Sequence, residues 1–292
     1  MSELVINIKS KILGMPTDVR FLLPDPPRGV DTDVFYASGK KYKVLWMLHG
    51  AEGNGKSFFY ETDIVNLAAG KDMIIACPDG LNSDFANHPQ LFGGYEYTTF
   101  FFEELMPLVQ NWFPASADPK DNFLTGYSMG GSGTLLLGFE HPEKFGGIAP
   151  FGTSVRESEF LKPYREMTSA QFRELTAASP TDFPTEYGPQ DGGILLKEVN
   201  MICKYPTVGG YIDSYECMWE RFPEKVRAGK LPKKVMFGCG DSDLAKQKIL
   251  AFKEYAESFG IEVFRYEFVS GYGHEIAVCN DLFPRMFEYF GL

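Results

Sequence analysis

The sequence predicts an α/β protein with a mostly parallel central sheet and helices on both faces. Short runs that are apolar at every position alternate with longer stretches of helical periodicity, and repeated strand–helix units of this kind build parallel sheets. Fully apolar runs suit strands that are buried on both faces. One such run leads into a glycine-flanked serine at a tight turn, followed by a helical stretch. We therefore expect the chemistry to lie at the carboxyl ends of the strands.

The N-terminal half supplies most of the expected strands. Residues 4–8 and 19–23 predict an antiparallel hairpin, and a loop rich in proline, aspartate and glycine is expected over 24–39. The further expected elements are strands over 44–48, 73–77, 122–125 and 146–151 and helices over 57–69, 98–112 and 130–139.

The alternation of strands and helices stops near residue 152 and resumes at 235. We interpret 154–230 as a helical, lid-like insertion in a single domain that spans 1–292. The elements expected after the insertion are strands over 235–239 and 263–269 and helices over 244–259 and 276–290.

Composition and net charge indicate which kinds of binding partner are expected. The chain has 292 residues, and 44% are hydrophobic, which is enough for a sizeable core. Its net charge is −11. Nucleic acids and anionic membranes both attract basic faces, so neither is expected as a partner. A small molecule is the expected substrate, and homo-oligomerisation stays open.

The cysteines and the first residues of the chain indicate the cellular compartment in which the protein is expected. The five cysteines are odd in number and form no CxxC pair, and Cys77 and Cys239 end apolar runs. We expect buried, reduced thiols at these two positions. The first residues show no basic or long apolar segment typical of a signal peptide, which predicts a cytoplasmic location.

The serine turn is the segment from Gly126 to Gly130, which reads Gly-Tyr-Ser-Met-Gly and fits the pattern of a nucleophile elbow. Strand and helix almost touch at such a turn, so the positions two before and two after the serine must be very small. The pentapeptide alone is a weak signal in a chain with 30 glycines. The strand before it and the helix after it make Ser128 the candidate nucleophile.

A nucleophilic serine needs a base, and His274 is the candidate. It lies in a glycine-flanked loop after the expected strand 263–269, and imidazole can accept and return a proton near neutral pH. Of the other histidines, His49 is expected to brace the loop after 44–48, and His141 to end the helix of the serine turn.

The third member of such a set is an acid that orients the imidazole. Asp241 and Asp243 both follow the strand 235–239, and from the residues alone either could serve while the other caps the next helix. The chain order serine, aspartate, histidine is the order seen in α/β-hydrolases. Backbone N–H groups of Ala51 and Met129 are the expected oxyanion donors, since Met129 follows the serine and Ala51 lies after an earlier strand.

Four segments together carry a resemblance to a known family: 48–54, 126–131, 239–243 and 271–274. The set resembles the "putative esterase" (esterase D-like) family of α/β-hydrolases, which includes tributyrin, feruloyl and acetylxylan esterases and S-formylglutathione hydrolase. In that family the acid ends a Cys-Gly-x-x-Asp segment, which corresponds to Asp243 here. The resemblance implies an α/β-hydrolase fold, hydrolysis of carboxyl esters through an acyl-serine, and no metal or organic cofactor.

We therefore expect a serine carboxylesterase acting on short-chain or aryl esters such as acetyl or hydroxycinnamoyl esters. The expected substrate contacts are His88, Tyr95 and Trp219, with Phe92 as a further candidate. The aromatic residues of the insertion form either a cleft wall or a small core of their own: Tyr211, Tyr215, Trp219 and Phe222. Two alternatives are an acyltransferase with the same triad, which product analysis with a competing acceptor distinguishes, and a non-catalytic binding protein on the same fold.

Overall fold

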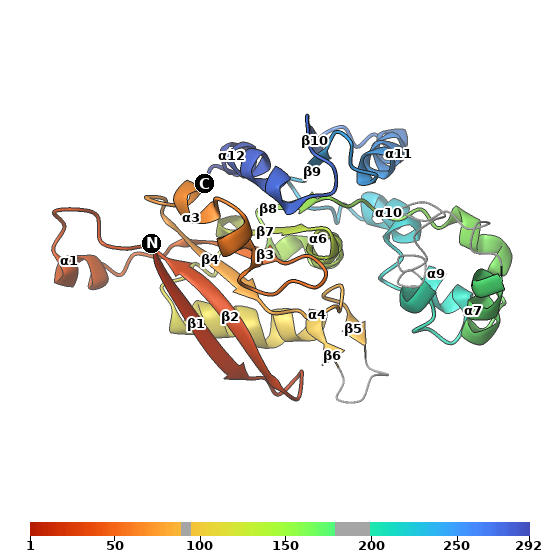
Figure 1. Cartoon of the computed structure of the whole chain (residues 1–292), viewed down its shortest axis with the longest axis horizontal. Helices are drawn as coiled ribbons and strands as arrows, with labels where there is room; N and C mark the ends of the chain where they lie inside the picture. Colours follow the sequence, from red (N-terminus) through yellow and green to blue (C-terminus); the bar gives the residue numbers. More distant parts are fainter. Residues whose placement is uncertain (89–94, 179–198) are drawn as a thin grey trace.

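The computed structural model describes residues 1–88, 95–178 and 199–292 (Figure 1). Within these ranges an eight-stranded sheet has the order β1-β2-β4-β3-β7-β8-β9-β10. The strands are β1 (Ser2–Lys9), β2 (Pro16–Leu23), β3 (Lys43–Leu48), β4 (Met73–Pro78), β7 (Asn122–Tyr127), β8 (Gly147–Phe151), β9 (Met236–Gly240) and β10 (Arg265–Val269). The hairpin β1–β2 and the pair β2–β4 are antiparallel, and the other pairs are parallel. The predicted mostly parallel sheet is confirmed.

Each face of the sheet carries its own apolar core, because successive side chains of a strand point to opposite faces. In β3, Trp46 and Leu48 belong to one cluster and Leu45 and Met47 to the other. The helices of the second cluster are α2 (Ser57–Glu61), α3 (Ile64–Leu67) and α12 (Cys279–Phe290). The first cluster packs under α4 (Tyr97–Phe100), η1 (Phe101–Leu105), α5 (Met106–Trp112), α6 (Met129–Glu140), α10 (Met218–Arg227) and α11 (Ala245–Ser258).

The remaining short elements are connections. They are α1 (Thr32–Tyr36), the two-stranded ladder of β5 (Asn87–His88) and β6 (Tyr95–Glu96), η2 (Pro119–Asp121), η3 (Pro142–Lys144), η4 (Glu159–Tyr164), α7 (Ser169–Ala178), α9 (Val208–Ile212) and η6 (Ile276–Val278). No helix within the described ranges is long and apolar enough to cross a bilayer.

Several predicted elements differ from the structure. The helix expected over 57–69 is broken into α2 and α3, because Thr62 is extended and the Asp63 N–H is held by Asn280 instead of continuing a helix. The loop expected over 24–39 contains α1, whose first turn is capped by Asp31. The helix expected over 98–112 includes the π-helical turn η1. Every predicted strand of the central sheet is present within three residues at either end.

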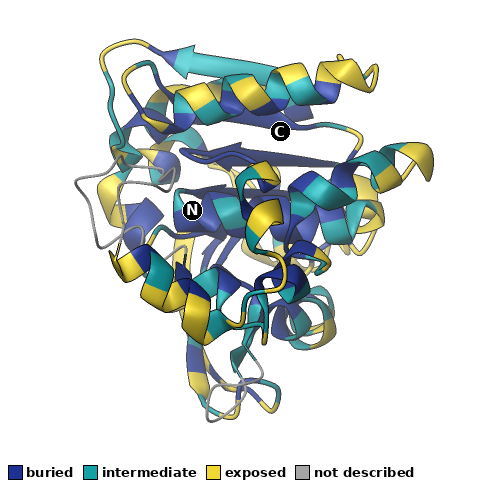
Figure 2. Cartoon of the chain, turned by 90° about the vertical axis from the view of Figure 1, so that its right-hand side faces the viewer, coloured by how far each residue is buried: buried dark blue, intermediate teal, exposed yellow. Residues whose placement is uncertain are grey.

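Within 154–178 and 199–230, the described parts of the predicted insertion, most residues are helical, and α7 and α9 stand at the right-hand side of Figure 1. It has a small apolar cluster of its own, made by Leu161, Phe172, Val199, Ile202, Val208, Tyr211, Ile212 and Cys217. Trp219 and Phe222, on α10, belong instead to the core under α11. Figure 2 views this side and shows buried strands behind helices with exposed outer faces.

The five cysteines are free thiols, and Cys77 and Cys239 are buried as predicted. Burial raises the pKa of Cys239 to about 12.

Candidate active site

Ser128 sits between β7 and α6 with φ 55° and ψ −114°, a left-handed backbone that an L-residue rarely adopts. Its N–H donates to the Phe151 carbonyl at 2.8 Å. A Cβ on Gly126 would lie 2.8 Å from Leu48 O, and closer still to the Gly130 carbonyl. The prediction that both flanking positions, Gly126 and Gly130, must be very small is confirmed, because a Cβ at either one would run into backbone atoms.

Two hydrogen bonds link three side chains that are far apart in the sequence. His274 Nε2 lies 2.9 Å from Ser128 Oγ, and His274 Nδ1 lies 2.9 Å from Asp243 Oδ2. The Asp243 side chain is completely buried, whereas that of His274 is about a quarter exposed. The Tyr127 ring lies beside the imidazole, with ring centroids 5.2 Å apart. Such a chain can draw a proton from the serine hydroxyl and orient the imidazole.

The two aspartates after β9 have different contacts. One carboxylate oxygen of Asp243 contacts His274, and the other accepts a hydrogen bond from the Ala245 N–H at 2.9 Å. Asp241 instead accepts hydrogen bonds from Ser270 Oγ at 2.9 Å and Gly271 N at 3.1 Å. The hydrogen bond from Ser270 is the largest cause that lowers the pKa of Asp241. Asp243, the aspartate that the resemblance implies, is the one that contacts His274. The expectation that the other aspartate caps the next helix is wrong, since Asp241 instead holds the loop that precedes His274.

His49 braces the loop after β3, as predicted. Its Nε2 accepts the Gly80 N–H at 2.8 Å, so Nδ1 carries the proton and donates to the Gly50 carbonyl at 2.7 Å. Burial lowers the pKa of His49, which favours this neutral form. In a planar trans peptide the N–H points opposite to the C=O. The Ala51 N–H therefore points away from His49.

The loop with Ala51 lies close to the serine. A Cβ built on Gly50 would lie 3.8 Å from Ser128 Cβ. Met129 is the first residue of α6, where N–H groups have no partner within the helix. Neither the Ala51 nor the Met129 N–H donates to another residue of the described chain. Both donors are therefore available to a ligand atom near Ser128.

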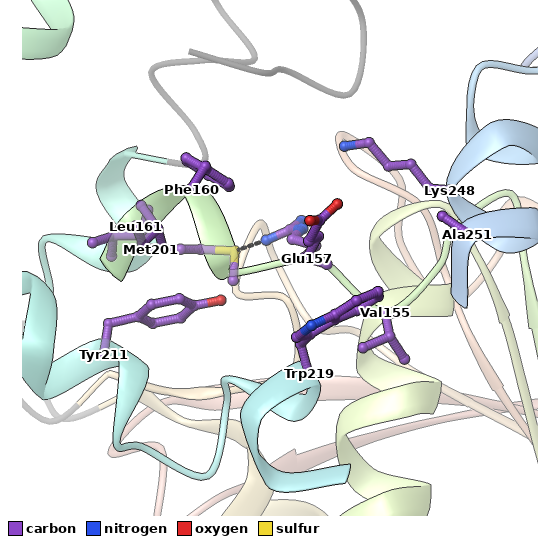
Figure 3. Close-up of a pocket in the computed structure, with 11 residues that line it drawn as sticks. Val155, Glu157, Phe160, Leu161, Met201, Tyr211, Trp219, Lys248 and Ala251 are labelled. Atoms are coloured by element: carbon purple, nitrogen blue, oxygen red, sulfur yellow. Dashed lines mark hydrogen bonds between the residues drawn. The ribbon is translucent and has the colours of Figure 1, made fainter. Parts of the chain in front are cut away.

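Two hollows lie between the insertion and the elements around the serine. The α11 hollow has a cavity volume of about 100 Å³ (Figure 3) and is lined by Val155, Arg156, Glu157, Phe160, Leu161, Met201, Ile202, Tyr211, Trp219, Lys248 and Ala251. The α6 hollow has about 30 Å³ and is lined by Asp84, Ala86, Ser132, Leu136, Ser154, Arg156, Met201, Tyr211, Glu216 and Met218. They share Arg156, Met201 and Tyr211, and Arg156 Nη1 lies against Met201 Sδ between them.

The predicted substrate contacts are only partly brought together. Trp219 lines the α11 hollow and stacks on Tyr255 with centroids 4.0 Å apart. His88 and Tyr95 pair across the β5–β6 ladder, and neither lines the two hollows. Phe92 lies outside the described residues. The lining residues Asp84, Arg156 and Met201 were not predicted, because no sequence pattern marks them. No cluster of metal-binding side chains occurs in residues 1–88, 95–178 and 199–292.

A mostly parallel sheet with a serine elbow after one strand, and with aspartate and histidine loops after two later strands, is the α/β-hydrolase fold of serine hydrolases. Residues 10–248 match the model of a family described as "Putative esterase", and the chain belongs to this family. The resemblance inferred from the four sequence motifs is thereby confirmed, and the protein is a carboxylic ester hydrolase.

Known proteins resemble the chain over its full length. An acetyl esterase of Caldicellulosiruptor saccharolyticus is 25% identical over 99% of this chain and 98% of its own. The substrate-bound structure of FphF, a fluorophosphonate-binding serine hydrolase of Staphylococcus aureus, has a TM-score of 0.73 at 20% identity and covers 99% of this chain and 98% of its own. A ferulic acid esterase has a TM-score of 0.67 at 18% identity, over 99% and 97% of the two chains. The solved structures support the fold, and the family model supports the activity.

Proposed function

We propose that the protein is a serine carboxylesterase in which Ser128 is the nucleophile, His274 the general base and acid, and Asp243 the residue that orients His274. The observation that carries the proposal is the continuous hydrogen-bonded chain from Ser128 Oγ through the imidazole to a fully buried carboxylate. The strained backbone of Ser128 supports it, because such strain concentrates at functional positions.

In this proposal Ser128 Oγ attacks the ester carbonyl while its proton passes to His274 Nε2. The imidazolium then protonates the leaving alkoxide, and the C–O bond of the ester breaks to leave an acyl-serine and a free alcohol. Water attacks the acyl-serine with His274 again as base, and the acid and the free serine result. Asp243 stabilises the imidazolium that forms in each half.

The oxyanion of each tetrahedral intermediate is proposed to bind the N–H groups of Ala51 and Met129. Their lack of other partners in the described chain, and the position of Met129 at the start of α6, support this assignment. Removing one such donor typically costs about 2.7–4 kcal/mol of barrier. The donors belong to the main chain, so side-chain substitutions at these positions are poor tests.

We propose short-chain and aryl esters, acetyl and hydroxycinnamoyl among them, as the substrates. The similarity of the chain to an acetyl esterase and to a ferulic acid esterase supports this range. Trp219, which lines the α11 hollow, is the preferred substrate contact, and His88 and Tyr95, which line neither hollow, are further candidates. We also propose that 154–230 covers the substrate, and that the enzyme works in the cytoplasm without a metal or organic cofactor.

The test is turnover of p-nitrophenyl acetate, p-nitrophenyl butyrate and methyl ferulate by the wild type, Ser128→Ala and His274→Ala. Ser258→Ala, an exposed serine at the end of α11, is the matched control. We expect both site variants to lose at least about a thousandfold in kcat/KM, and the control to match the wild type. Equal background rates in all four proteins would contradict the proposal. Labelling by a fluorophosphonate should likewise depend on Ser128.

A further inference from the structure

The loop after β4 contacts several of the elements that surround Ser128. Gly80 N–H binds His49 and the Asn82 side chain accepts the Glu52 N–H at 2.8 Å, so this loop supports the loop that carries Ala51. Its next residues reach α6, because a Cβ on Gly133 would lie 2.8 Å from the Phe85 ring. The loop thus forms one wall of the space beside Ser128.

Asp84, in this loop, has two unusual features. It and Phe85 have φ of 54° and 55°, two successive left-handed residues of which neither is glycine. The Asp84 side chain is also buried, with 7% of the residue exposed, and its Oδ1 has no hydrogen-bond partner in the described part of the chain. Backbone strain and an unpaired buried oxygen each destabilise a fold, so a structural role does not explain this residue.

Glu216 lines the same α6 hollow, and one of its carboxylate oxygens likewise has no hydrogen-bond partner in the described part of the chain. It is 6% exposed, and one oxygen pairs with Lys204 and accepts the Tyr205 hydroxyl at 2.8 Å. The other oxygen, Oε2, has no partner within the described residues. Two separate parts of the chain therefore bring an unsatisfied carboxylate oxygen to one small hollow.

The α6 hollow adjoins the proposed nucleophile. Ser132 lines it and lies four residues after Ser128, a rise of about 6 Å along the axis of α6. Its volume of about 30 Å³ is room for a water-sized group and not for a ring. Two cations accompany the two carboxylates, since Arg156 lines the hollow and Lys204 pairs with Glu216. A small neutral hydrogen-bond donor fits this space better than a cation.

We propose that Asp84 and Glu216 form a specificity subsite that accepts hydrogen bonds from a hydroxyl group of the ester substrate. The inference rests on the proposed function, because it places this hydroxyl on the ester that Ser128 attacks. A site built to bind a hydroxyl rejects the analogue that lacks it, since the buried acceptors then stay unpaired. The hydroxyl can come from the acyl part or from the alcohol part of the ester.

The experiment compares kcat/KM, measured by acid release, within pairs of esters. Methyl para-coumarate against methyl cinnamate tests the acyl part, and glyceryl monobutyrate against propyl butyrate tests the alcohol part. Choline butyrate against its uncharged neohexyl analogue tests recognition of a cation. The proteins are the wild type, Asp84→Asn, Glu216→Gln and the control Asp72→Asn, whose carboxylate is exposed and far along the sequence from the hollow. Asparagine keeps the size of Asp84 and tolerates a positive φ.

We expect the wild type to prefer the hydroxylated ester by about 10- to 100-fold in one of the two hydroxyl pairs. Asp84→Asn and Glu216→Gln should each lower that preference by about 3- to 10-fold, because an amide accepts a weaker hydrogen bond than a carboxylate. Asp72→Asn should leave it unchanged. The Tm of Asp84→Asn should equal or exceed that of the wild type, whereas a structural carboxylate would lower it.

Turnover without any hydroxyl preference, or a preference that both substitutions leave intact, refutes the subsite. A preference confined to the choline ester refutes it too, in favour of charge recognition. Absence of turnover of every ester by the wild type refutes the proposed function and the subsite with it, so the two failures are distinct.

Discussion

Replacing Gly130 by alanine tests whether the geometry of the serine turn controls the activity. Gly130 lies in the first turn of α6, two residues after Ser128, where the helix packs against the end of β3. A Cβ at this position would lie 2.6 Å from His49 O and closer still to the Leu48 carbonyl. These neighbours are backbone atoms, which cannot rotate away as a side chain can.

The size of the effect follows from the required displacement. A real Cβ keeps at least 3.0 Å from such atoms, so His49 O alone demands 0.4 Å and the Leu48 carbonyl more than twice that. The shift, on the order of 1 Å, separates Ser128 from the loop that carries Ala51. A misplacement of about 1 Å can cost about a hundredfold in rate. Overpacking of this kind also costs about 1–3 kcal/mol of stability.

The assay is kcat/KM with p-nitrophenyl acetate, together with Tm by thermal melting. The matched control is Gly138→Ala, two turns further along α6, where the new Cβ would lie 2.7 Å from Cδ1 and Cγ2 of Ile148, which are side-chain and not backbone atoms. Both substitutions give the same helix-propensity gain of about 1 kcal/mol. We expect Gly130→Ala to lose about a hundredfold in kcat/KM and the control less than about threefold. Equal, near-native activity of the two variants would refute this reasoning.

The other predictions concern the supporting residues. Asp243→Asn should lower kcat by about a thousandfold or more, whereas Asp241→Asn, which loses only contacts to the loop before His274, should lower it less than about tenfold; a reversed order of the two variants would contradict the assignment. His49→Gln should lower kcat more than it raises KM, because the Gly50–Ala51 peptide loses its brace; an effect on KM alone would argue against that role. The pKa of His49 is lowered in the folded state, so its stabilising contribution is complete above about pH 6.5 and falls as the pH drops below that value. Denaturant unfolding from pH 8 to pH 5 should therefore show the wild type losing its stability advantage over His49→Gln as the pH falls.

Much of the fold could be predicted because its signals are local. Strands that are apolar throughout, such as β3 and β4, identify themselves by composition alone. The interruption between α2 and α3 could not be predicted, because it depends on Asn280, which is more than two hundred residues away in the sequence. The π-helical turn at Phe101 has no sequence signal of its own.

In the candidate site, too, some residues could be predicted from the sequence and others could not. Ser128 and His274 carry glycine-rich surroundings that the sequence displays, and they could be found before the structure. The choice between Asp241 and Asp243 could not be made from the residues, because both follow the same strand. Asp84 had no signal at all, since its unusual character lies in backbone conformation and burial.

Residues with a left-handed backbone lie together at the edge of the sheet where Ser128 and the neighbouring loops are found. Within the described ranges, the residues other than glycine with positive φ are Glu52, Leu81, Asp84, Phe85 and Ser128. All of them follow β3, β4 or β7, three neighbouring strands, at their carboxyl ends. Strain of about 1–3 kcal/mol per residue persists only where surrounding contacts determine the conformation. Here the His49 ring, the Asn82 side chain and the Phe151 carbonyl supply those contacts, joining loop to loop and the elbow to the sheet. The stability of the two apolar cores thus maintains one strained edge of the sheet, where the proposed nucleophile, the Ala51 N–H and the Asp84 carboxylate lie on backbone that is held in place before a substrate binds.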